Sequence, residues 1–382
     1  MAYYRRRGCN CKNKKKCTCG AKWSFSVDIG IDPITKKRKQ KTASGFSSKK
    51  EAQIAAEELE KQIRDKTYIE VTEQTLKQFI DEWSESVAKN RMRESTYYNR
   101  LGIINNKIVP VLGYVKIKDI EPSTVQSYYN KLINEDKLST SYVRTIHNLL
   151  SSIFKYAKKW DKVKVNIMEK VDAPIPNHKE MKTWNKDEAS KFLDATKDAP
   201  THIAYVLAVY TGMRMGEILG LRWKDIDFSN QTIHIVQTLV RIDGGFTFQE
   251  PKTRNSKRQI AIDDYVVSEL EKRKEQQETN SELVVTTGIG TPYSPRNLQR
   301  NFNMLIKKAK VPKIRFHDLR HTHATLLLKL GEHPKVVSER LGHSKISVTL
   351  DTYSHVIPDM QKPTAKKFSN LLRGQNVVKE DK

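Results

Sequence analysis

Six side chains in the second half of the chain are of types that can together perform chemistry on a phosphodiester. Guanidinium groups bind the non-bridging oxygens of a phosphate through paired hydrogen bonds. A phenol oxygen beside them can attack phosphorus and form a covalent intermediate. The set therefore predicts an enzyme that breaks and rejoins DNA. The six residues are Arg214 in TGMRMGE, Lys252 in EPKTRNSKR, His317 and Arg320 in HDLRH, His343 in LGHS and Tyr353 in DTYSH.

The HDLRH motif places His317 and Arg320 three residues apart at the start of a predicted helix. This spacing puts both side chains on one side of the helix, near its positive end, where an anion is stabilised. His321 follows four residues after His317, a spacing that also suits a zinc site. The metalloprotease pattern needs Glu directly after the first His, whereas Asp318 stands there and no third ligand is evident. We therefore reject a zinc site on this helix.

The other motifs place their residues at helix ends and in a turn. Arg214 follows a Thr-Gly turn and begins a second predicted helix, where a bound phosphate would offset the unfavourable dipole. Glu217, one turn on, is expected to pack structurally, with a tether to the guanidinium as the alternative. Lys252 lies in a basic turn between predicted strands, from which an ammonium can reach a leaving-group oxygen, and Lys257 competes for this assignment. Tyr353 is predicted to lie in a short helix.

The chemistry of this set is not that of a magnesium enzyme. Nucleases and transposases that hold Mg²⁺ need clustered carboxylates, whereas the ordered motif residues here are cationic or imidazole side chains. Such cations supply the same charge stabilisation without a metal. Together the motifs resemble those of the tyrosine recombinases, specifically the phage and mobile-element integrases. The resemblance covers essentially the whole chain and is most specific over residues 210–356.

The resemblance implies a role for every residue of the set and a set of partners. It implies a covalent 3′-phosphotyrosine intermediate and a 5′ hydroxyl, with no cofactor for catalysis and no ATP. The expected partners are double-stranded attachment sites with core and arm sequences, three further copies in a homotetramer, and an excisionase or host DNA-bending protein. The implied roles are phosphate clamping for Arg214 and Arg320, protonation of the departing 5′ oxygen for Lys252, proton shuttling for His317, a phosphate hydrogen bond for His343, and nucleophilic attack for Tyr353.

Two other functions fit parts of the pattern. A non-catalytic DNA-binding regulator or architectural protein could keep the same fold, but the complete catalytic set disfavours it. A type IB topoisomerase uses related chemistry without a specific site, and the extra basic N-terminal region disfavours that assignment.

Charge is concentrated at the N-terminus of this 382-residue chain. The net charge is +25, and residues 1–50 hold fifteen Lys and Arg against Asp28 and Asp32, which leaves +13 in that stretch. A surplus of this size indicates a polyanionic partner bound through phosphate neutralisation. No apolar stretch approaches the ~20 residues that span a bilayer, and MAYYRRRGCN lacks the apolar run of a secretory signal. We therefore expect the protein in the cytoplasm of a bacterial host, associated with the nucleoid.

The N-terminal region is predicted to form a small sheet with one helix. WSFSVDIGI alternates apolar and polar residues as a half-buried strand does, Asp32-Pro33 signals a turn, and KKRKQKTASGF is the returning strand. Ser47 or Ser48 can cap a helix that begins near Lys49 and carries Ile54, Leu59 and Ile63 along one side. Its basic residues are the candidate DNA contacts: Arg5, Arg6, Arg7, Lys14, Lys15, Lys16, Lys36, Lys37, Arg38, Lys39 and Lys41.

The expected fold class is multidomain α+β. Residues 1–68 resemble an arm-type DNA-binding domain, and 74–171, with helical apolar spacing, resemble a helical core-DNA-binding bundle. Residues 173–184 are predicted to be a linker. Residues 180–375 are predicted to be a mostly α catalytic domain with a short antiparallel sheet, and 376–382 a tail. The segment 363–372 is expected to dock on a neighbouring subunit or on its own domain.

All the cysteines lie between residues 9 and 19, so disulfides cannot build the fold. In each CxC pair the thiols would share one face of a strand, and two such strands would bring four thiols together. A structural Zn²⁺ site is one interpretation, although zinc ribbons usually have CxxC spacing. Thiols without a metal in a basic arm are the favoured alternative. The residues are Cys9, Cys11, Cys17 and Cys19.

Overall fold

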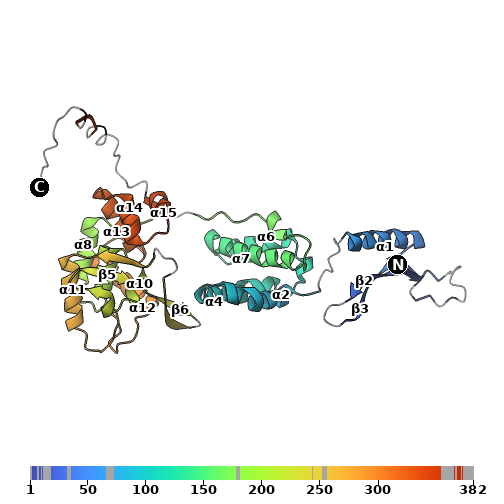
Figure 1. The fold of residues 1–382 in the computed structure, drawn as a ribbon, viewed down its shortest axis with the longest axis horizontal. Helices are drawn as coiled ribbons and strands as arrows, with labels where there is room; N and C mark the ends of the chain where they lie inside the picture. Colours follow the sequence, from blue (N-terminus) through green and yellow to red (C-terminus); the bar gives the residue numbers. More distant parts are fainter. Residues whose placement is uncertain are drawn as a thin grey trace. The chain divides into compact units, whose positions relative to one another are not determined.

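A computed structural model gives the fold of the chain (Figure 1). It has two compact units, one formed by Met1–Arg93 with Asn99–Asn177 and the other by Glu94–Tyr98 with His178–Lys382. The predicted α+β class is confirmed, because helices are combined with small antiparallel sheets. Within the described part of the chain, no helix is long and apolar enough to cross a membrane. The structure describes residues 2–6, 8, 9, 11, 19–31, 36–65, 73–177, 181–242, 244–251, 256–353, 365, 368–370 and 372.

The chain begins with a three-stranded antiparallel sheet in the order β1-β2-β3. Both predicted strands and the predicted helix are present, and Phe25 and Val27 of β2 are buried. The sequence pattern does not predict β1, because four residues are too few to show a clear alternation. The expected turn at Asp32-Pro33 lies outside the described residues. The bounds are Tyr3–Arg6 for β1, Trp23–Ile31 for β2, Arg38–Phe46 for β3 and Lys49–Arg64 for α1.

Helix α1 covers one face of this sheet. Its predicted cap is confirmed, since the Ser48 side chain accepts a hydrogen bond from the Glu51 N–H at 3.1 Å. Its predicted apolar side is partly wrong, because Ile54 is 59% exposed. Ala52 and Ala56 are fully buried instead. Their short side chains let the helix backbone approach the sheet closely, and the other two predicted apolar residues pack beside them.

The strands expected at the cysteines are absent from the described residues. Strand β1 ends at Arg6, and Cys9 and Cys11 follow it as irregular chain. Gly8 adopts φ +75°, a left-handed conformation that ends an extended strand. Cys19 lies in a bend before β2, and Cys17 lies outside the described residues.

The rest of the first unit is helical, as the apolar spacing predicts. Helix α6 begins with Pro122 at its first position, where a missing N–H costs no helical hydrogen bond. Trp83, Tyr128 and Tyr129 are buried, so these aromatic rings form core and not a surface for stacking bases. Contacts of α7 with both α2 and α6 hold the bundle together. The main helices are Leu76–Trp83 (α2), Pro122–Asn134 (α6), Thr140–Lys159 (α7) and Glu94–Ile103 (α4), of which the first five residues, Glu94–Tyr98, belong to the second unit.

The second unit is built on an aromatic core and on α9, whose residues are nearly all buried. The predicted linker 173–184 is wrong at its end: Trp184 is 1% exposed and its Nε1 donates to the Pro312 carbonyl at 2.8 Å. Its ring packs in a tilted arrangement against Phe192 and Phe302, at centroid distances of 4.8 and 5.9 Å. The helices are Lys186–Ala195 (α8), His202–Thr211 (α9), Met215–Leu219 (α10), Asp264–Glu275 (α11), Pro295–Ala309 (α12), Asp318–Lys329 (α13), Pro334–Leu341 (α14) and Ile346–Tyr353 (α15).

The strands of this unit form two sheets, whereas one was expected. One sheet has the order β4-β5-β8, and the other is the hairpin β6-β7. The chain leaves the first sheet after β5 and enters the second at β6. Between these strands the Gln237 side chain donates to the Gly220 carbonyl at 2.8 Å. Strand β6 then packs on α10, since a Cβ on Gly216 would lie 2.5 Å from Thr238 Oγ1. The strands are Ile226–Asp227 (β4), Thr232–Ile235 (β5), Thr238–Ile242 (β6), Gly245–Gln249 (β7) and Arg258–Ala261 (β8).

Candidate active site

Arg320 lies in the first turn of α13 and is held from inside the protein. Its side chain is buried, and its two terminal nitrogens donate to the carbonyls of Gly212 and Leu341 at 2.8 and 2.7 Å. Gly212 adopts φ +65° at the end of α9, so the turn before α10 presents this carbonyl. These two bonds fix the plane of the guanidinium. Burial, with repulsion from Arg214, lowers the pKa of Arg320 to about 9.

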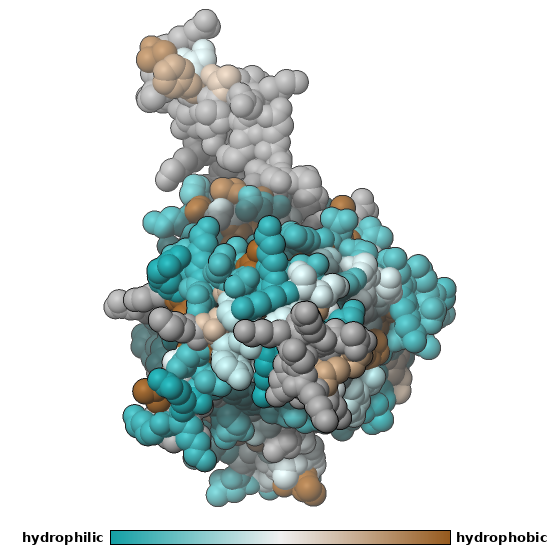
Figure 2. Space-filling model, turned by 90° about the vertical axis from the view of Figure 1, so that its right-hand side faces the viewer, coloured by the Kyte–Doolittle hydropathy of each residue, from teal (hydrophilic) through white to brown (hydrophobic). Residues whose placement is uncertain are grey.

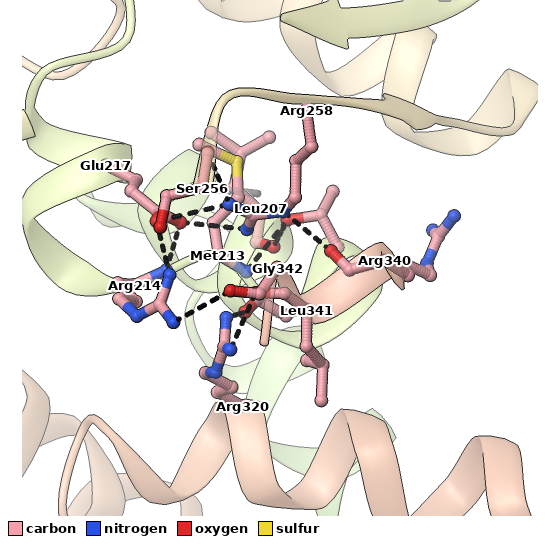
Figure 3. A network of polar contacts seen from close by, with 12 residues as sticks. Leu207, Met213, Arg214, Glu217, Ser256, Arg258, Arg320, Arg340, Leu341 and Gly342 are labelled. Carbon is pink, nitrogen blue, oxygen red and sulfur yellow. Dashed lines mark hydrogen bonds and ion pairs between the residues drawn. The ribbon is translucent and has the colours of Figure 1, made fainter. Parts of the chain in front are cut away.

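Arg214 reaches the same place from a different helix (Figure 3). It is the residue before α10, and one of its nitrogens lies 3.4 Å from the Gly342 carbonyl, next to the Leu341 carbonyl that binds Arg320. Another of its nitrogens donates to Glu217 at 2.8 Å. Its side chain stays 37% exposed. Two guanidinium groups therefore converge on consecutive main-chain carbonyls, and one of them keeps access to solvent.

Glu217 is a buried carboxylate shared between two arginines. Arg258 of β8 binds both its oxygens, at 3.2 and 2.9 Å. Arg214 also donates to both, to Oε1 from its guanidinium at 2.8 Å and to Oε2 from its main-chain N–H at 2.9 Å. Burial alone would raise the pKa of Glu217, but the hydrogen bonds and charge of Arg258, with the charge of Arg214, lower it. Both readings of Glu217 from the sequence are thus correct: it packs inside the protein and it tethers Arg214. Sequence reasoning missed Arg258, which has no motif of its own.

The two predicted histidines lie beside the arginines. His343 follows the Leu341–Gly342 pair, and its Nδ1 lies 2.8 Å from Thr349 Oγ1. Burial, followed by Arg320, lowers the pKa of His343 to about 4. His317 precedes α13 and retains exposed surface, yet the surrounding protein withdraws part of its ring from water. This desolvation and the adjacent Arg320 lower the pKa of His317. Both rings are therefore neutral near pH 7 and can each donate one hydrogen bond.

Tyr353 ends α15 and is 1% exposed. Its ring packs in a small cluster with Ala324, Leu328 and Leu341 of α13 and α14. Its hydroxyl lies 2.7 Å from Nδ1 of His321. Burial raises the pKa of Tyr353 to about 12, against an opposing effect of the nearby Arg320. From the sequence, His321 is considered only as a zinc ligand and is rejected. Its position one turn after His317, on the same side of the helix, is the signal that could have placed it in the site.

A cavity of about 430 Å³ opens beside Arg214, Glu217 and His343. Its wall is cationic at Arg214 and polar at the neutral His343 ring, whereas Val240 and Val348 make part of it apolar. Lys252 lies outside the described residues, so its predicted role stays a prediction. Pro251 and Ser256, on either side of the segment 252–255, both line the cavity. The competing Lys257 is paired with Glu250 at 2.9 Å.

The basic residues of the arm are arranged differently from those of the pocket. Lys36, Lys37, Arg38, Lys39 and Lys41 are all exposed, on β3 and just before it. Arg5 is exposed as well, whereas Arg6 stacks over the Trp23 ring at 5.0 Å and so also supports the fold. Hydrophilic residues predominate on the face drawn in Figure 2. The remaining candidates, Arg7, Lys14, Lys15 and Lys16, lie outside the described residues.

Three of the four cysteines lie close together. The sulfur atoms of Cys9, Cys11 and Cys19 are all within 4.8 Å of one another. The chain after β1 and the chain before β2 supply them, and Cys17 lies outside the described residues.

Three regions of the chain match known families. Residues 182–359 match the Phage integrase family, 75–133 the phage integrase N-terminal SAM-like domain, and 12–63 an Arm DNA-binding domain. The chain is 30% identical to a protein named Tyrosine recombinase XerC-like from Caldanaerobacter subterraneus subsp. tengcongensis, over 85% of this chain and 90% of that protein. It is 31% identical to the ICEBs1 integrase of Bacillus subtilis, over 92% and 97%.

Solved structures show the same fold. The Tn1549 transposon integrase in complex with a circular intermediate DNA matches with a TM-score of 0.68 and 22% identity, over 77% of this chain and 99% of that one. A lambda integrase tetramer bound to a Holliday junction matches with a TM-score of 0.57 and 20% identity, over 85% and 94%. The sequence motifs, and the relatives that match over most of their length, indicate the same family as these folds. The chain belongs to the phage integrase family of tyrosine recombinases, as a site-specific DNA recombinase of the integrase type.

Proposed function

We propose that Tyr353 is the nucleophile and that Arg214 and Arg320 bind the scissile phosphate. The phenol oxygen attacks phosphorus, the 5′ oxygen departs, and a 3′-phosphotyrosine link to the DNA remains. A second attack by a 5′ hydroxyl reverses the step and rejoins the strand, so no ATP is needed. His343 would donate a hydrogen bond to the phosphate. His317 and Lys252 are assigned to proton transfer by the family resemblance.

The convergence of Arg214 and Arg320 is the observation that supports this proposal best. Two like charges at consecutive carbonyls repel one another, and burial adds to the cost for Arg320. A dianionic transition state placed between them would remove that repulsion, which is how preorganised charge accelerates a reaction. Catalysis by this family requires no cofactor, and the pocket residues are consistent with charge stabilisation by the protein alone.

Covalent capture on a nicked duplex tests the nucleophile. The duplex carries the element's own core site, identified by sequencing the DNA that flanks the gene. The nick lets the short fragment that carries the released 5′ hydroxyl diffuse away, so that the strand cannot be rejoined. Wild-type protein is expected to give a DNA-linked band on a denaturing gel. Tyr353→Phe should give none while it binds the core site within about threefold of wild type, because only the hydroxyl is removed. An equal band from the variant would refute the assignment, and relaxation of plasmids that lack the site would indicate a topoisomerase instead.

We also propose the division of labour along the chain and its setting. Residues 1–68 would bind arm sites, 74–171 and the catalytic domain 180–375 would enclose the core site, and 376–382 would form a tail. Four copies on two duplexes would exchange strands, as the Holliday junction complex of lambda integrase suggests. An excisionase or a host DNA-bending protein would set direction. A chromosomal attachment site would place the enzyme at the nucleoid, in the cytoplasm of a bacterium.

We further propose that the cysteine cluster holds a structural Zn²⁺. Thiolates around tetrahedral zinc lie about 3.8 Å apart, given Zn–S bonds of about 2.3 Å, and the cluster of Cys9, Cys11 and Cys19 is compatible with that spacing. Cys17 is the expected fourth ligand. The metal would fasten the chain after β1 to the chain before β2, in a sheet too small to bury much apolar surface.

Metal analysis tests this zinc site. Full-length protein is expected to contain one zinc per chain and to lose it in Cys9→Ser or Cys11→Ser. Loss of zinc should also weaken arm-site binding and leave core-site cleavage unchanged. Protein that is purified from zinc-supplemented cells without bound metal, and that still binds arm sites, would contradict the proposal.

A further inference from the structure

The phenol of Tyr353 has a hydrogen-bond partner to which no role has been assigned. Its hydroxyl lies 2.7 Å from Nδ1 of His321, and the two ring centroids are 5.7 Å apart. His321 is the partner that the described residues provide for this hydroxyl. An imidazole nitrogen at this distance can take the phenol proton directly, with no water between.

His321 is placed by the same stretch of backbone that places the phosphate ligands. It lies one turn after His317 on α13, and the two rings meet edge to face at 5.1 Å. The preceding residue, Arg320, is fixed by the carbonyls of Gly212 and Leu341. A single helix start therefore presents a phosphate ligand and the partner of the nucleophile in a fixed relation.

We propose that His321 is a further catalytic residue, the acceptor of the Tyr353 proton. As the phenol oxygen forms its bond to phosphorus, its proton passes to Nδ1, and the bond from phosphorus to the 5′ oxygen breaks. A separate group, assigned above to Lys252, protonates that departing oxygen. In rejoining, the 5′ hydroxyl attacks phosphorus, and the imidazolium returns the proton to the departing phenolate. This proposal rests on Tyr353 as the nucleophile.

The surroundings of His321 link this transfer to the presence of DNA. Burial, then the adjacent His317, lower the pKa of His321 to about 4, and burial raises the pKa of Tyr353 to about 12. Without DNA the proton therefore stays on the phenol, and the nucleophile is inert. A bound phosphate adds negative charge beside Arg320, and negative charge raises the pKa of an imidazole. The charged and titratable groups that act on His321 or contact it are His317, Asp318, Arg320, Arg315, His343 and Tyr353.

Two versions of the nicked core-site duplex separate this role from protonation of the leaving group. One has the natural 5′ oxygen at the scissile phosphate, and the other has a bridging 5′ sulfur, which departs without a proton. Single-turnover cleavage is measured for His321→Gln, for Lys252→Ala and for a control, His234→Gln, which changes an exposed histidine on β5. We expect His321→Gln to cleave both duplexes about 10²–10⁴-fold more slowly than wild type, the usual range for a lost proton acceptor. The sulfur duplex should rescue Lys252→Ala only.

Several outcomes would overturn the role of His321. The first is cleavage by His321→Gln at a rate within about threefold of wild type. The second is rescue of His321→Gln by the sulfur duplex. The third is a loss of core-site binding by His321→Gln that is as large as its loss of cleavage rate. Should the variant fail to fold, the wild-type pH profile on the sulfur duplex decides: a rate that rises with pH on the acid limb supports a proton acceptor, and a flat limb opposes it. Failure of the nucleophile assignment looks different. Tyr353→Phe should give no adduct at any pH, whereas His321→Gln should slowly give the wild-type adduct.

Discussion

Cationic side chains serve the two ends of this chain in opposite ways. In the catalytic pocket, Arg320 is 3% exposed, and main-chain carbonyls bind both its terminal nitrogens. In the arm, the Arg38 side chain is 76% exposed and stands in a run of exposed lysines. A buried, fixed guanidinium suits a charge that must meet a transition state, because it needs no reorganisation. An exposed basic run suits a polyanion, because counterion release depends on the number of charges more than on their orientation.

This contrast predicts that the two ends will respond to different perturbations. The pocket should be sensitive to geometry at constant charge, and the arm to charge at constant geometry. The expected effects decrease from the pocket to the arm.

Arg320→Lys should give the largest effect. The charge is kept, but an ammonium cannot hold the carbonyls of Gly212 and Leu341 while it binds two phosphate oxygens. We expect single-turnover cleavage to fall by about 10²–10³-fold, the range seen when one preorganised donor is lost. The matched change in the arm, Arg38→Lys, should leave cleavage and binding within about twofold. Equal small effects of the two variants would contradict the contrast.

Glu217→Gln should mainly affect stability. It removes the carboxylate shared by Arg258 and Arg214 and leaves a buried guanidinium without its counter-charge. Removing one partner of a buried pair costs about 3 kcal/mol, and we expect a drop of that order in the free energy of unfolding, measured by urea titration. The control Glu250→Gln breaks the exposed pair with Lys257 and should change stability by less than about 0.5 kcal/mol. A small effect of Glu217→Gln would show that Arg258 does not depend on this carboxylate.

Lys41→Ala should give the smallest effect, and one that depends on salt. Removing one phosphate contact should weaken arm-site binding a few-fold at low salt and reduce the slope of log K against log salt by about 0.9. Removing residues 1–68 should flatten this slope much further, because many such contacts are lost together. Equal slopes for the full-length and shortened proteins would contradict the arm assignment.

Local signals in the sequence predicted much of the fold. Helix α12 is an example, because Pro295 suits its first turn and because its apolar residues recur at helical spacing. The cap of α1 at Ser48 was likewise predictable from neighbouring residues alone. The same pattern failed for Ile54, because apolar character says nothing about how closely a helix backbone approaches a sheet.

Features that depend on distant contacts were not predictable in this way. Between the two sheets the Gln237 side chain bonds the Gly220 carbonyl, a distant contact that no periodicity reveals. The site shows the same limit. The six motif residues could be named from the sequence, but Arg258 and His321 became visible only when the fold brought them to Glu217 and Tyr353.

Identifying the residue that carries the DNA tests the central claim most directly. The covalent complex formed on the nicked core-site duplex is digested with trypsin, and the DNA-linked peptide is analysed by tandem mass spectrometry. The 3′ phosphate is expected on Tyr353, in the peptide that contains the end of α15. An adduct on any other residue, or no adduct under conditions in which the protein recombines its sites, would contradict the active site described above.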